Sequence, residues 1–221
     1  MSVEVKIVDD PMAACAAEIS AAFQAGGPVV LTGGSTVSAY QHVSDWSGQQ
    51  LWFSDERCVP VNDARSNYGS VVAALGPRLD EADCERIAGE LTPTDAAARY
   101  EQALLSRALS GFELFIVGLG PDAHICSMFP GQASLDERSR LVVGVPEAGL
   151  EPFVSRVTLT FPAIALARKV VVMAAGAAKA DALSAAFAED APVTREVPAS
   201  LLSEYCDNIL VLTDDAGAVR L

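Results

Sequence analysis

Short runs of apolar, often β-branched residues alternate with alanine-rich stretches along this 221-residue chain. Such alternation is typical of βαβ units, in which helices connect the strands of a parallel sheet. The pattern therefore predicts an α/β fold with a largely parallel sheet flanked by helices. The expected strands cover residues 3–8, 29–32, 51–54, 112–118, 140–145, 156–160, 169–174 and 208–213. Helices are expected at 11–24, 36–43, 66–75, 94–109 and 176–187, with a short helical turn near 198–202.

Helix caps and irregular stretches complete this outline. Asp10, which precedes Pro11, and either Thr92 or Thr94 are residue types that cap helix N-termini. Residues 76–90 and 144–155 follow neither a helical nor a strand pattern, so we expect irregular structure there, with surface loops as candidates. The length suits one α/β domain with a substantial core, and the chain has no internal repeat or long linker, so we expect a single domain over residues 1–221.

The composition indicates a folded globular protein, because 51% of the residues are hydrophobic. No run approaches the roughly 18 apolar residues needed to cross a bilayer. Residues 1–6 contain no basic stretch leading into an apolar run, so we expect no secretory signal. The five cysteines form no Cys-x-x-Cys pair or Cys/His cluster, so we expect no metal site, no redox disulfide and a reducing cytoplasm. These cysteines are Cys15, Cys58, Cys84, Cys126 and Cys206.

The formal net charge of −14 at pH 7 argues against nucleic acids and anionic membranes as partners, because the overall field repels polyanions. A phosphorylated substrate would meet the same field. A phosphate site in this chain therefore requires a local reversal of charge, made from a few arginines, a lysine and backbone N–H groups. Basic residues near glycine-rich segments become the natural candidates.

A polar segment directly follows each of the second, third and fourth expected strands. These segments are Gly33-Gly-Ser-Thr36, Asp55-Glu-Arg57 and Gly118-Leu-Gly-Pro-Asp-Ala-His124. In open parallel sheets, ligands bind in the crevice outside the carboxyl ends of the strands. If these strands are parallel neighbours, the three segments converge on one site.

The loop at 33–36 has features of an anion site. Gly33 and Gly34 lack side chains, so backbone N–H groups can approach an anion, and Ser35 and Thr36 add hydroxyl donors. The helix that follows offers unsatisfied N–H groups and the positive end of its dipole. The loop is neither a Walker A loop nor a dinucleotide fingerprint. Phosphate binding and an ordinary tight turn with a Ser/Thr cap are both open for this loop alone.

The next segment holds three ionisable residues, Asp55, Glu56 and Arg57. Charged side chains at a strand end are commonly no more than solvated. Arg57 is of interest because its planar guanidinium can bind phosphate or carboxylate through two hydrogen bonds. Asn67, near the start of a later helix, either serves only that helix or faces the same site.

Of the two histidines in the chain, His124 has the more functional setting. It lies in a loop rich in Gly and Pro, two residues after Asp122, which can orient the imidazole or stabilise its protonated form. Histidine suits proton transfer near neutral pH. His42 falls on a predicted amphipathic helix, where we expect a surface or packing role. Cys126 allows a nucleophile, but a buried apolar role is the better expectation because this loop offers it no second histidine as a base.

Two further basic residues follow. Arg156 opens a predicted strand, and Lys179 lies in the first turn of a predicted helix after Gly176. Either side chain can simply be solvated. A lysine at a helix N-terminus is unfavourable with the helix dipole, which suggests a compensating anion nearby.

Together these segments resemble the 6-phosphogluconolactonases, within the larger group that includes glucosamine-6-phosphate deaminases and ribose-5-phosphate isomerases. The resemblance runs in order from about residue 29 to 183 and implies the Rossmann-like fold of that group. The matching segments are Leu31-Thr-Gly-Gly-Ser-Thr36, Trp52-Phe-Ser-Asp-Glu-Arg57 with Val59-Pro60, Ser66-Asn67-Tyr68, Gly118-Leu-Gly-Pro-Asp-Ala-His124, Ser127-Met-Phe-Pro-Gly131, Arg156-Val-Thr-Leu-Thr160, and Gly176 with Lys179.

The same resemblance separates lactonases from deaminases. Deaminases of the group typically have Asn-Glu-Pro after the Asp-x-His loop and Asp-Glu-Tyr in place of Asp-Glu-Arg. This chain has Met128-Phe-Pro-Gly131 and Arg57, which favour the lactonases. Two positions depart from the lactonase pattern, since Ala123 replaces a usual Gly and Val37 a usual Pro. If that Gly adopts a positive φ, Ala123 would be strained by roughly a kcal/mol or more.

The resemblance implies hydrolysis of 6-phospho-D-glucono-1,5-lactone to 6-phosphogluconate in the oxidative pentose phosphate pathway, without metal or cofactor. His124 would be the general base and Asp122 its partner in catalysis. Substrate and phosphate binding would fall to Gly33, Gly34, Ser35, Thr36, Asp55, Arg57, Arg156 and Lys179, with backbone N–H groups near Gly33 and Gly34 as one possible source of oxyanion stabilisation.

We therefore expect a cytoplasmic enzyme, a monomer or small homo-oligomer, whose partner is a phosphorylated sugar lactone and neither nucleic acid nor membrane. Two alternatives stay open. One is a sugar-phosphate deaminase or isomerase. The other is a non-catalytic sugar-phosphate-binding protein in which His124 is dispensable.

Overall fold

The structure is a computed structural model that describes residues 2–107 and 110–221. Its strands are β1 (Ser2–Ile7), β2 (Val29–Leu31), β3 (Gln50–Phe53), β4 (Asp55–Arg57), β5 (Asp83–Cys84), β6 (Leu114–Gly118), β7 (Val142–Val145), β8 (Arg156–Leu159), β9 (Val170–Met173) and β10 (Asn208–Thr213). Its α-helices are α1 (Pro11–Ala25), α2 (Val37–Tyr40), α3 (Asn67–Leu75), α4 (Pro93–Ser106), α5 (Phe161–Ile164), α6 (Ala180–Phe187) and α7 (Leu202–Tyr205). Short 3-10 helices are η1 (Gly34–Thr36), η2 (Gly76–Glu81), η3 (Ala133–Asp136), η4 (Ala177–Lys179), η5 (Pro198–Leu201) and η6 (Ala218–Arg220).

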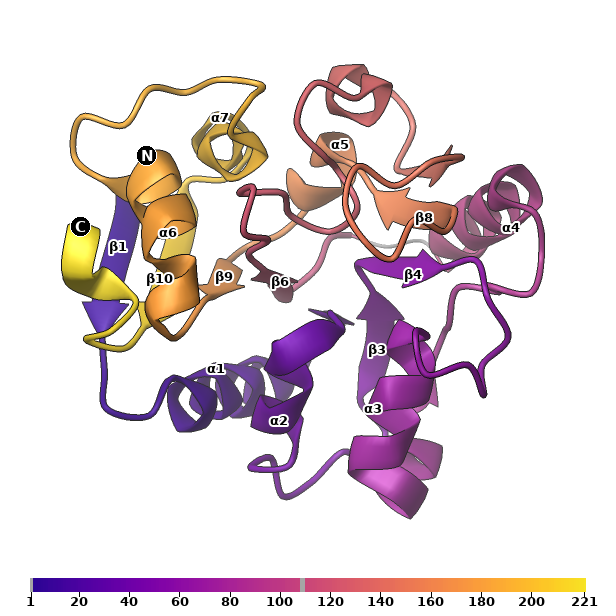
Figure 1. Ribbon diagram of the computed structural model, residues 1–221. Coiled ribbons are helices and arrows are strands. Elements are labelled where there is room, and N and C mark those ends of the chain that lie inside the picture. The colour runs from indigo at the N-terminus through magenta and orange to yellow at the C-terminus, as the bar shows by residue number, and fades with distance from the viewer. Residues whose placement is uncertain (1, 108–109) are drawn as a thin grey trace.

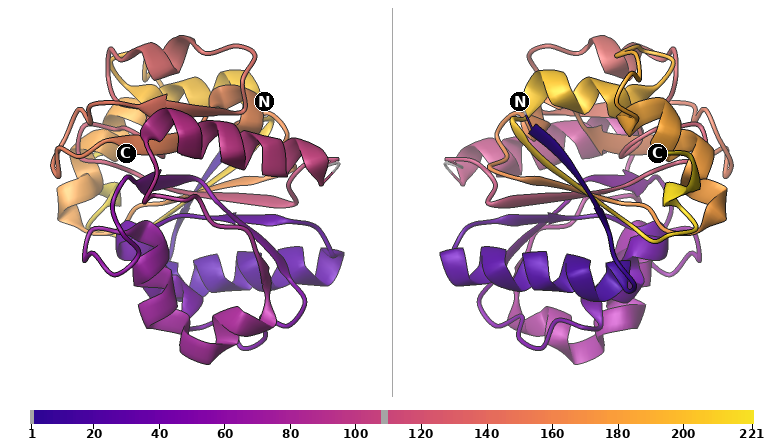
Figure 2. Two further views of the ribbon diagram at one scale, coloured as in Figure 1. Left: turned by 90° about the vertical axis from the view of Figure 1, so that its right-hand side faces the viewer. Right: turned by 90° about the vertical axis from the view of Figure 1, so that its left-hand side faces the viewer.

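Within the described residues, seven strands form one sheet in the order β1-β10-β9-β6-β2-β3-β5, and all neighbouring pairs in it are parallel. Helices α1, α2 and α3 lie on one face of this sheet (Figure 1). Helices α4, α5 and α7 lie on the other face, together with strands of a second, smaller sheet (Figure 2). The predicted α/β fold, a largely parallel sheet flanked by helices, is confirmed.

The second sheet was not predicted. Its strands are antiparallel in the order β4-β8-β7. The strands expected at 140–145 and 156–160 are present, but they join this sheet instead of the parallel one. Residues 55–57 were expected as a polar loop and instead form β4, because their backbone groups pair with those of β8.

The two stretches expected to be irregular also contain regular structure. Residues 76–90 include η2 and β5, the last strand of the parallel sheet, and Ile87 in the same stretch is buried. Residues 144–155 begin with the second half of β7. The strand within residues 76–90 was not predicted because β5 has only two residues, which are extended through their pairing with β3.

Helix boundaries follow the caps that the sequence offers. The Asp10 carboxylate accepts hydrogen bonds from the backbone N–H groups of Met12 and Ala13 at 3.0 Å each, as expected for the start of α1. Thr92, and not Thr94, caps α4. That helix ends at Ser106, and the expected helical residues 108–109 lie outside the described residues. The helix expected at 36–43 is shorter, since α2 ends at Tyr40.

Helix α4 is fixed to both sheets, and one anchor is Tyr100. Its buried hydroxyl accepts a hydrogen bond from the backbone N–H of Phe53 at 2.6 Å and donates one to the Phe53 carbonyl at 3.1 Å. Two bonds to the same residue fix the end of β3 immediately before β4 begins. The start of β4, and with it Asp55, is thereby held in place.

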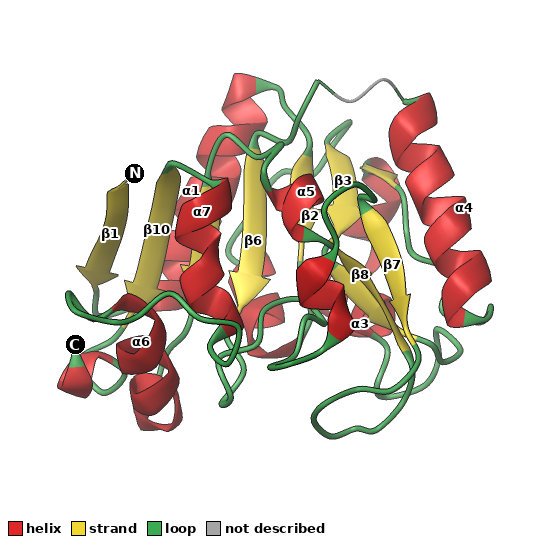
Figure 3. Ribbon diagram, turned by 90° about the horizontal axis from the view of Figure 1, so that it is seen from above, coloured by secondary structure: helices red, strands yellow, loops and turns green. Residues whose placement is uncertain are grey.

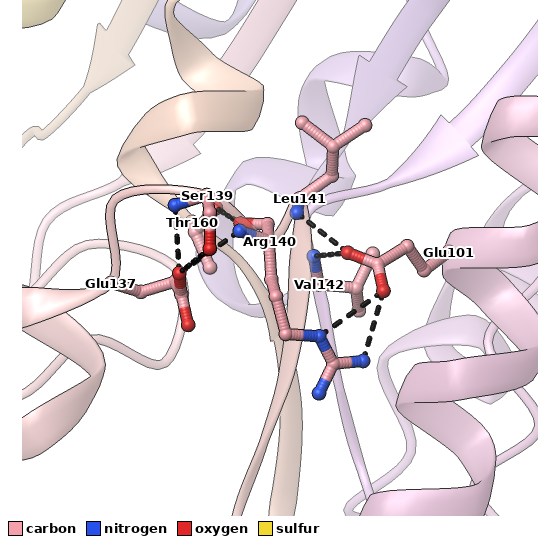
Figure 4. Close-up of polar contacts among 7 residues, drawn as sticks. All are labelled: Glu101, Glu137, Ser139, Arg140, Leu141, Val142 and Thr160. Atoms are coloured by element: carbon pink, nitrogen blue, oxygen red, sulfur yellow. Dashed lines mark hydrogen bonds and ion pairs between the residues drawn. The ribbon is translucent and has the colours of Figure 1, made fainter.

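The second anchor is Glu101, whose carboxylate faces the start of β7 (Figure 4). It accepts hydrogen bonds from the backbone N–H groups of Leu141 at 2.7 Å and Val142 at 3.3 Å and pairs with Arg140 at 2.9 Å. Glu137 accepts further bonds from the backbone N–H groups of this connection, including that of Arg140 at 2.9 Å. Backbone donors at the edge of β7 are thus satisfied by side chains, which holds the antiparallel sheet against α4.

The position of the site follows from the strand order. From β2 the chain moves to β3 and β5 on one side of the sheet, then crosses back to β6, β9 and β10 on the other. The strand order therefore reverses between β2 and β6, and their carboxyl ends point to the same edge of the sheet (Figure 3). Ligands of open α/β sheets bind at such a reversal, outside the carboxyl ends.

Candidate active site

A cleft lies at this reversal, and all three polar segments predicted from the sequence contribute to its lining. The expectation that β3, β2 and β6 are parallel neighbours is confirmed. The lining residues are Thr32, Gly33, Gly34, Ser35, Thr36, Asp55, Arg57, Asn67, Gly118, Leu119, Gly120, Pro121, His124, Cys126, Arg156 and Lys179. The cleft thus brings together every residue predicted for the site except Asp122, which lies beside it in contact with His124.

The loop after β6 holds an Asp122–His124 pair. The Nδ1 atom of His124 lies 2.5 Å from Oδ1 of Asp122, and the backbone N–H of His124 donates to the same oxygen at 3.3 Å. The ring also packs against Phe129, with a centroid distance of 4.5 Å. Nδ1 is therefore occupied, and Nε2 has no hydrogen-bond partner among the residues that the structure describes, so Nε2 is the nitrogen available for proton transfer.

The carboxyl group of Asp122 is held in its ionised form. Burial raises its pKa, but the hydrogen bonds and the charge of His124 outweigh burial and lower the pKa below its ordinary value. An ionised partner at Nδ1 fixes the imidazole tautomer with its free nitrogen at Nε2 and stabilises an imidazolium once Nε2 takes up a proton.

The backbone of this loop is closely packed and strained. A Cβ at Gly120 would lie 2.1 Å from Nδ1 of His124, so glycine is needed for the imidazole to reach Asp122. Ala123 has φ +60° and Cys126 has φ +52°, in the left-handed region that favours glycine. The conditional expectation for Ala123 is thus met, and its backbone conformation costs roughly 1–2 kcal/mol.

Cys126 lines the cleft but is buried, and burial raises the pKa of its thiol well above the ordinary value. A thiol that resists ionisation is a poor nucleophile, in agreement with the expected apolar packing role. His42 is exposed beyond the end of α2, in agreement with its expected surface role.

The loop after β2 runs directly into η1. Gly34 has φ +69°, and Gly34 and Ser35 are exposed, whereas Thr36 is buried. Gly33 is extended, and a Cβ there would lie 2.1 Å from Oδ1 of Asn67. Gly33 is thus required for contact with Asn67, a requirement that the sequence did not reveal.

Arg57 and Arg156 lie directly opposite each other in the β4–β8 pair, and both line the cleft. Arg156 is buried and donates to the carbonyl oxygens of Pro152 at 2.9 Å and Val154 at 3.2 Å. Burial lowers the pKa of Arg156, and the charge of Arg57 lowers it further. Like charges directly opposite in a sheet destabilise it, so an anion in the cleft would relieve this repulsion.

Lys179 reaches the cleft from the other side, at the end of η4. Its Nζ donates to the carbonyl oxygen of Leu119 at 2.6 Å. Burial lowers the pKa of Lys179, and the charge of Asp122 opposes that shift. The compensating groups expected near Lys179 are therefore a carbonyl oxygen and a neighbouring carboxylate. Arg57, Arg156 and Lys179 give the cleft the local reversal of charge that a chain of net charge −14 needs in order to bind phosphate.

Asp55 is a buried carboxylate in the lining of the cleft. Both oxygens of Asp55 are occupied, Oδ1 by Ser54 at 3.0 Å and Asn67 at 3.1 Å, and Oδ2 by Ser127 at 2.7 Å. Asp55 therefore lines the cleft as predicted, with its hydrogen bonds directed to the protein. The bond to Ser127 links β4 to the loop that carries His124.

Glu56 has a structural role that the sequence analysis missed. Its carboxylate lies at the N-terminus of α3 and accepts from the backbone N–H groups of Arg57, Asn67 and Tyr68 at 2.6–2.8 Å and from the Ser66 hydroxyl at 3.0 Å. Burial raises the pKa of Glu56, although these backbone donors oppose the shift. The signal available in the sequence was the acidic residue followed by a Ser-Asn-Tyr helix start, where N-terminal N–H groups need acceptors.

No group of three or more His, Cys, Asp or Glu side chains in residues 2–107 and 110–221 is placed to hold a metal ion. In the same ranges, no helix combines the length and apolar character needed to cross a membrane.

The fold and the cleft define a class of protein: an α/β protein whose cleft, at the carboxyl edge of a parallel sheet, holds an Asp–His pair together with two arginines and a lysine. Comparison with known proteins narrows this class. Residues 4–211 match the family described as glucosamine-6-phosphate isomerases/6-phosphogluconolactonase, and the chain belongs to this family. The resemblance to the 6-phosphogluconolactonases expected from the sequence is thereby confirmed.

Individual relatives agree with this assignment. The chain is 35% identical over 224 residues to a 6-phosphogluconolactonase of Mycobacterium tuberculosis, covering 90% of this chain and 88% of the relative. It is 32% identical over 232 residues to a 6-phosphogluconolactonase of Homo sapiens, covering 96% and 86%. The solved 6-phosphogluconolactonase of Trypanosoma brucei superposes with a TM-score of 0.77 at 26% identity, covering 100% of this chain and 99% of that one.

Proposed function

We propose that this protein hydrolyses 6-phospho-D-glucono-1,5-lactone to 6-phosphogluconate, a step of the oxidative pentose phosphate pathway. The observation that carries the proposal is the one cleft lined by His124, which pairs with Asp122, and by the opposed arginines Arg57 and Arg156. The pair supplies a base for water, and the arginines supply a site for the phosphate. Relatives that are named 6-phosphogluconolactonase support the same substrate.

In the proposed mechanism, His124 is the general base. Its Nε2 removes a proton from a water molecule as the water oxygen forms a bond to the C1 carbonyl carbon of the lactone. The tetrahedral intermediate then collapses, the bond from C1 to the ring oxygen breaks, and the imidazolium returns the proton to that oxygen. Asp122 stabilises the imidazolium between these steps. The scheme requires no metal, cofactor or covalent intermediate.

The phosphate is held, in this proposal, by Arg57 and Arg156, with Lys179 on the opposite side of the cleft. Guanidinium groups bind phosphate through paired, charge-assisted hydrogen bonds. The loop of Gly33, Gly34, Ser35 and Thr36 contributes backbone and hydroxyl donors, and its N–H groups are the candidates for stabilising the oxyanion at C1. Asp55 contributes by holding other site residues in place, since its own oxygens are occupied.

We further propose a cytoplasmic protein, composed of one domain and active as a monomer or small homo-oligomer, without a nucleic-acid partner. The net charge of −14 and the free state of Cys15, Cys58, Cys84, Cys126 and Cys206 support this setting.

Product analysis tests the proposed reaction. The purified protein is given freshly generated 6-phosphogluconolactone, and the spontaneous rate of ring opening is subtracted. The proposal predicts saturable formation of 6-phosphogluconate. Parallel assays with glucosamine 6-phosphate and with ribose 5-phosphate address the deaminase and isomerase alternatives. Release of ammonia or an isomerised sugar without lactone hydrolysis would reject the proposal, and so would tight binding of 6-phosphogluconate with no turnover.

A further inference from the structure

Asn67 has an unpaired, buried acceptor at the wall of the cleft. The residue begins α3, is 2% exposed, and lines the cleft. Its backbone N–H donates to Glu56 at 2.7 Å, and its side-chain Nδ2 donates to the carbonyl oxygen of Asp55 at 3.0 Å and to Asp55 Oδ1 at 3.1 Å. Its Oδ1 is buried and has no hydrogen-bond partner among the described residues.

The orientation of the Asn67 amide is fixed by these contacts. The nitrogen faces two oxygen acceptors of Asp55, and an exchanged amide would set its oxygen against both of them. Oδ1 consequently points to Gly33, where it approaches so closely that a Cβ on that glycine would lie 2.1 Å away. The glycine backbone leaves room for this oxygen at the wall of the cleft.

A buried acceptor without a donor is costly, so it calls for a partner outside the protein. The chemistry of the proposed substrate limits the choice of donor. The phosphate and the lactone carbonyl present acceptors, whereas the ring hydroxyl groups present donors. A carboxamide oxygen accepts but does not donate, so it can recognise one of these hydroxyls and cannot bind the phosphate directly.

We infer that Asn67 is a specificity-determining residue whose Oδ1 accepts a hydrogen bond from a ring hydroxyl of the bound lactone. Asp55 is then a positioning residue that fixes the Asn67 amide, and Gly33 provides the space. The inference rests on the proposed function, since it concerns how the same cleft selects a polyhydroxylated ring.

The test compares substrates within each protein preparation. Wild type, Asn67→Ala and Asn67→Ser are assayed with 6-phosphogluconolactone and with its 2-deoxy, 3-deoxy and 4-deoxy analogues. We expect kcat/KM for the parent lactone to fall about tenfold in Asn67→Ala, a loss equivalent to about 1.4 kcal/mol. For one deoxy analogue, the one that lacks the bound hydroxyl, kcat/KM of wild type should already be lowered, and Asn67→Ala should lower it no further. Because the readout is a ratio between substrates, partial unfolding of a variant cancels.

A control variant sharpens the test. Val72→Ala, at an exposed position of the same helix as Asn67, should leave all four substrates unchanged.

The possible failures are distinct. Equal losses for every substrate in Asn67→Ala, or no loss at all, would overturn the inference while lactone hydrolysis by wild type stands. Absence of turnover by wild type would reject the proposed function itself, and the inference with it.

Discussion

The two walls of the cleft are built differently. The wall after β6 is a strained loop in which Ala123 and Cys126 have positive φ and the His124 imidazole lies against the Gly120 backbone. The opposite wall is a regular antiparallel pair, β4 and β8, with Arg57 and Arg156 in register. In the proposed mechanism, the strained wall is the one where a proton is transferred at one nitrogen. The regularly paired wall needs only to hold its charges at a fixed distance.

This contrast assigns different kinetic roles to the two walls. Damage to the loop after β6 should lower kcat, because it removes an interaction used in the transition state. Damage to the β4–β8 wall should raise KM, because the proposed mechanism keeps the phosphate bound there throughout the reaction.

Asp122→Asn should lower kcat about 10³-fold with little change in KM. An amide in place of the carboxylate no longer fixes the imidazole tautomer or stabilises the imidazolium. Steady-state kinetics on fresh lactone measure both constants. A raised KM with normal kcat would show instead that this wall binds substrate.

Arg57→Ala should raise KM about 10- to 100-fold and leave kcat nearly unchanged, since it removes charge-assisted hydrogen bonds to the phosphate. Arg195→Ala is the matched control, because Arg195 pairs with Asp136 away from the cleft lining. If Arg57→Ala instead reduces kcat at an unaltered KM, the division between the walls is wrong.

Glu56→Gln should reduce the free energy of unfolding by about 2 kcal/mol. The NH₂ group of the glutamine would face hydrogen-bond donors, such as the Ser66 hydroxyl and the Tyr68 backbone N–H, that now donate to the carboxylate. Denaturant unfolding measures the change, and Glu90→Gln, at a partly exposed pair with Arg86, should have a smaller effect. An unchanged free energy of unfolding in Glu56→Gln would contradict this structural role of Glu56.

Affinity for 6-phosphogluconate should fall severalfold in the alkaline range, at a lower pH than an ordinary lysine would give. Burial lowers the pKa of Lys179 below its usual 10.5, so its charge is lost as pH rises through that lowered value. Calorimetry with this product avoids the spontaneous opening of the lactone. Lys179→Arg should remove the dependence, and an unchanged profile in that variant would exclude Lys179 as the source.

Ala123→Gly should change the free energy of unfolding by less than about 1 kcal/mol. Glycine removes the backbone strain of the positive φ, which stabilises the fold. It also removes a buried methyl group and gives the unfolded chain more freedom, and both of these effects destabilise the fold. Ala123→Val is the contrasting variant, since β-branched residues do not tolerate this backbone conformation. Normal stability in Ala123→Val would show that the loop can relax at no cost.

Much of the fold could be predicted because its strands are apolar and long enough to be recognised alone. All eight expected strands are present. β4 was missed because Asp55, Glu56 and Arg57 have no strand-like pattern and extend only through pairing with β8, about a hundred residues further along the chain. β5 was missed because two residues give no periodicity.

The site was predictable to the extent that its residues follow strands in recognisable segments. His124, Arg57 and the glycine loop were found in this way, and the parallel order of β3, β2 and β6 brings them together. The acceptor role of Glu56 was missed although the Ser-Asn-Tyr helix start offered a signal for it. The contact between Gly33 and Asn67 was not predictable, because it depends on how the start of α3 lies against the loop after β2.

The most direct test of the central claim is lactone hydrolysis by His124→Gln beside His42→Gln, the other histidine and an exposed one. With the spontaneous rate subtracted, we expect His42→Gln to match wild type. In folded His124→Gln, kcat should fall by about 10²- to 10⁴-fold while 6-phosphogluconate still binds. Near-normal turnover by His124→Gln would contradict the assignment of His124 as the catalytic base.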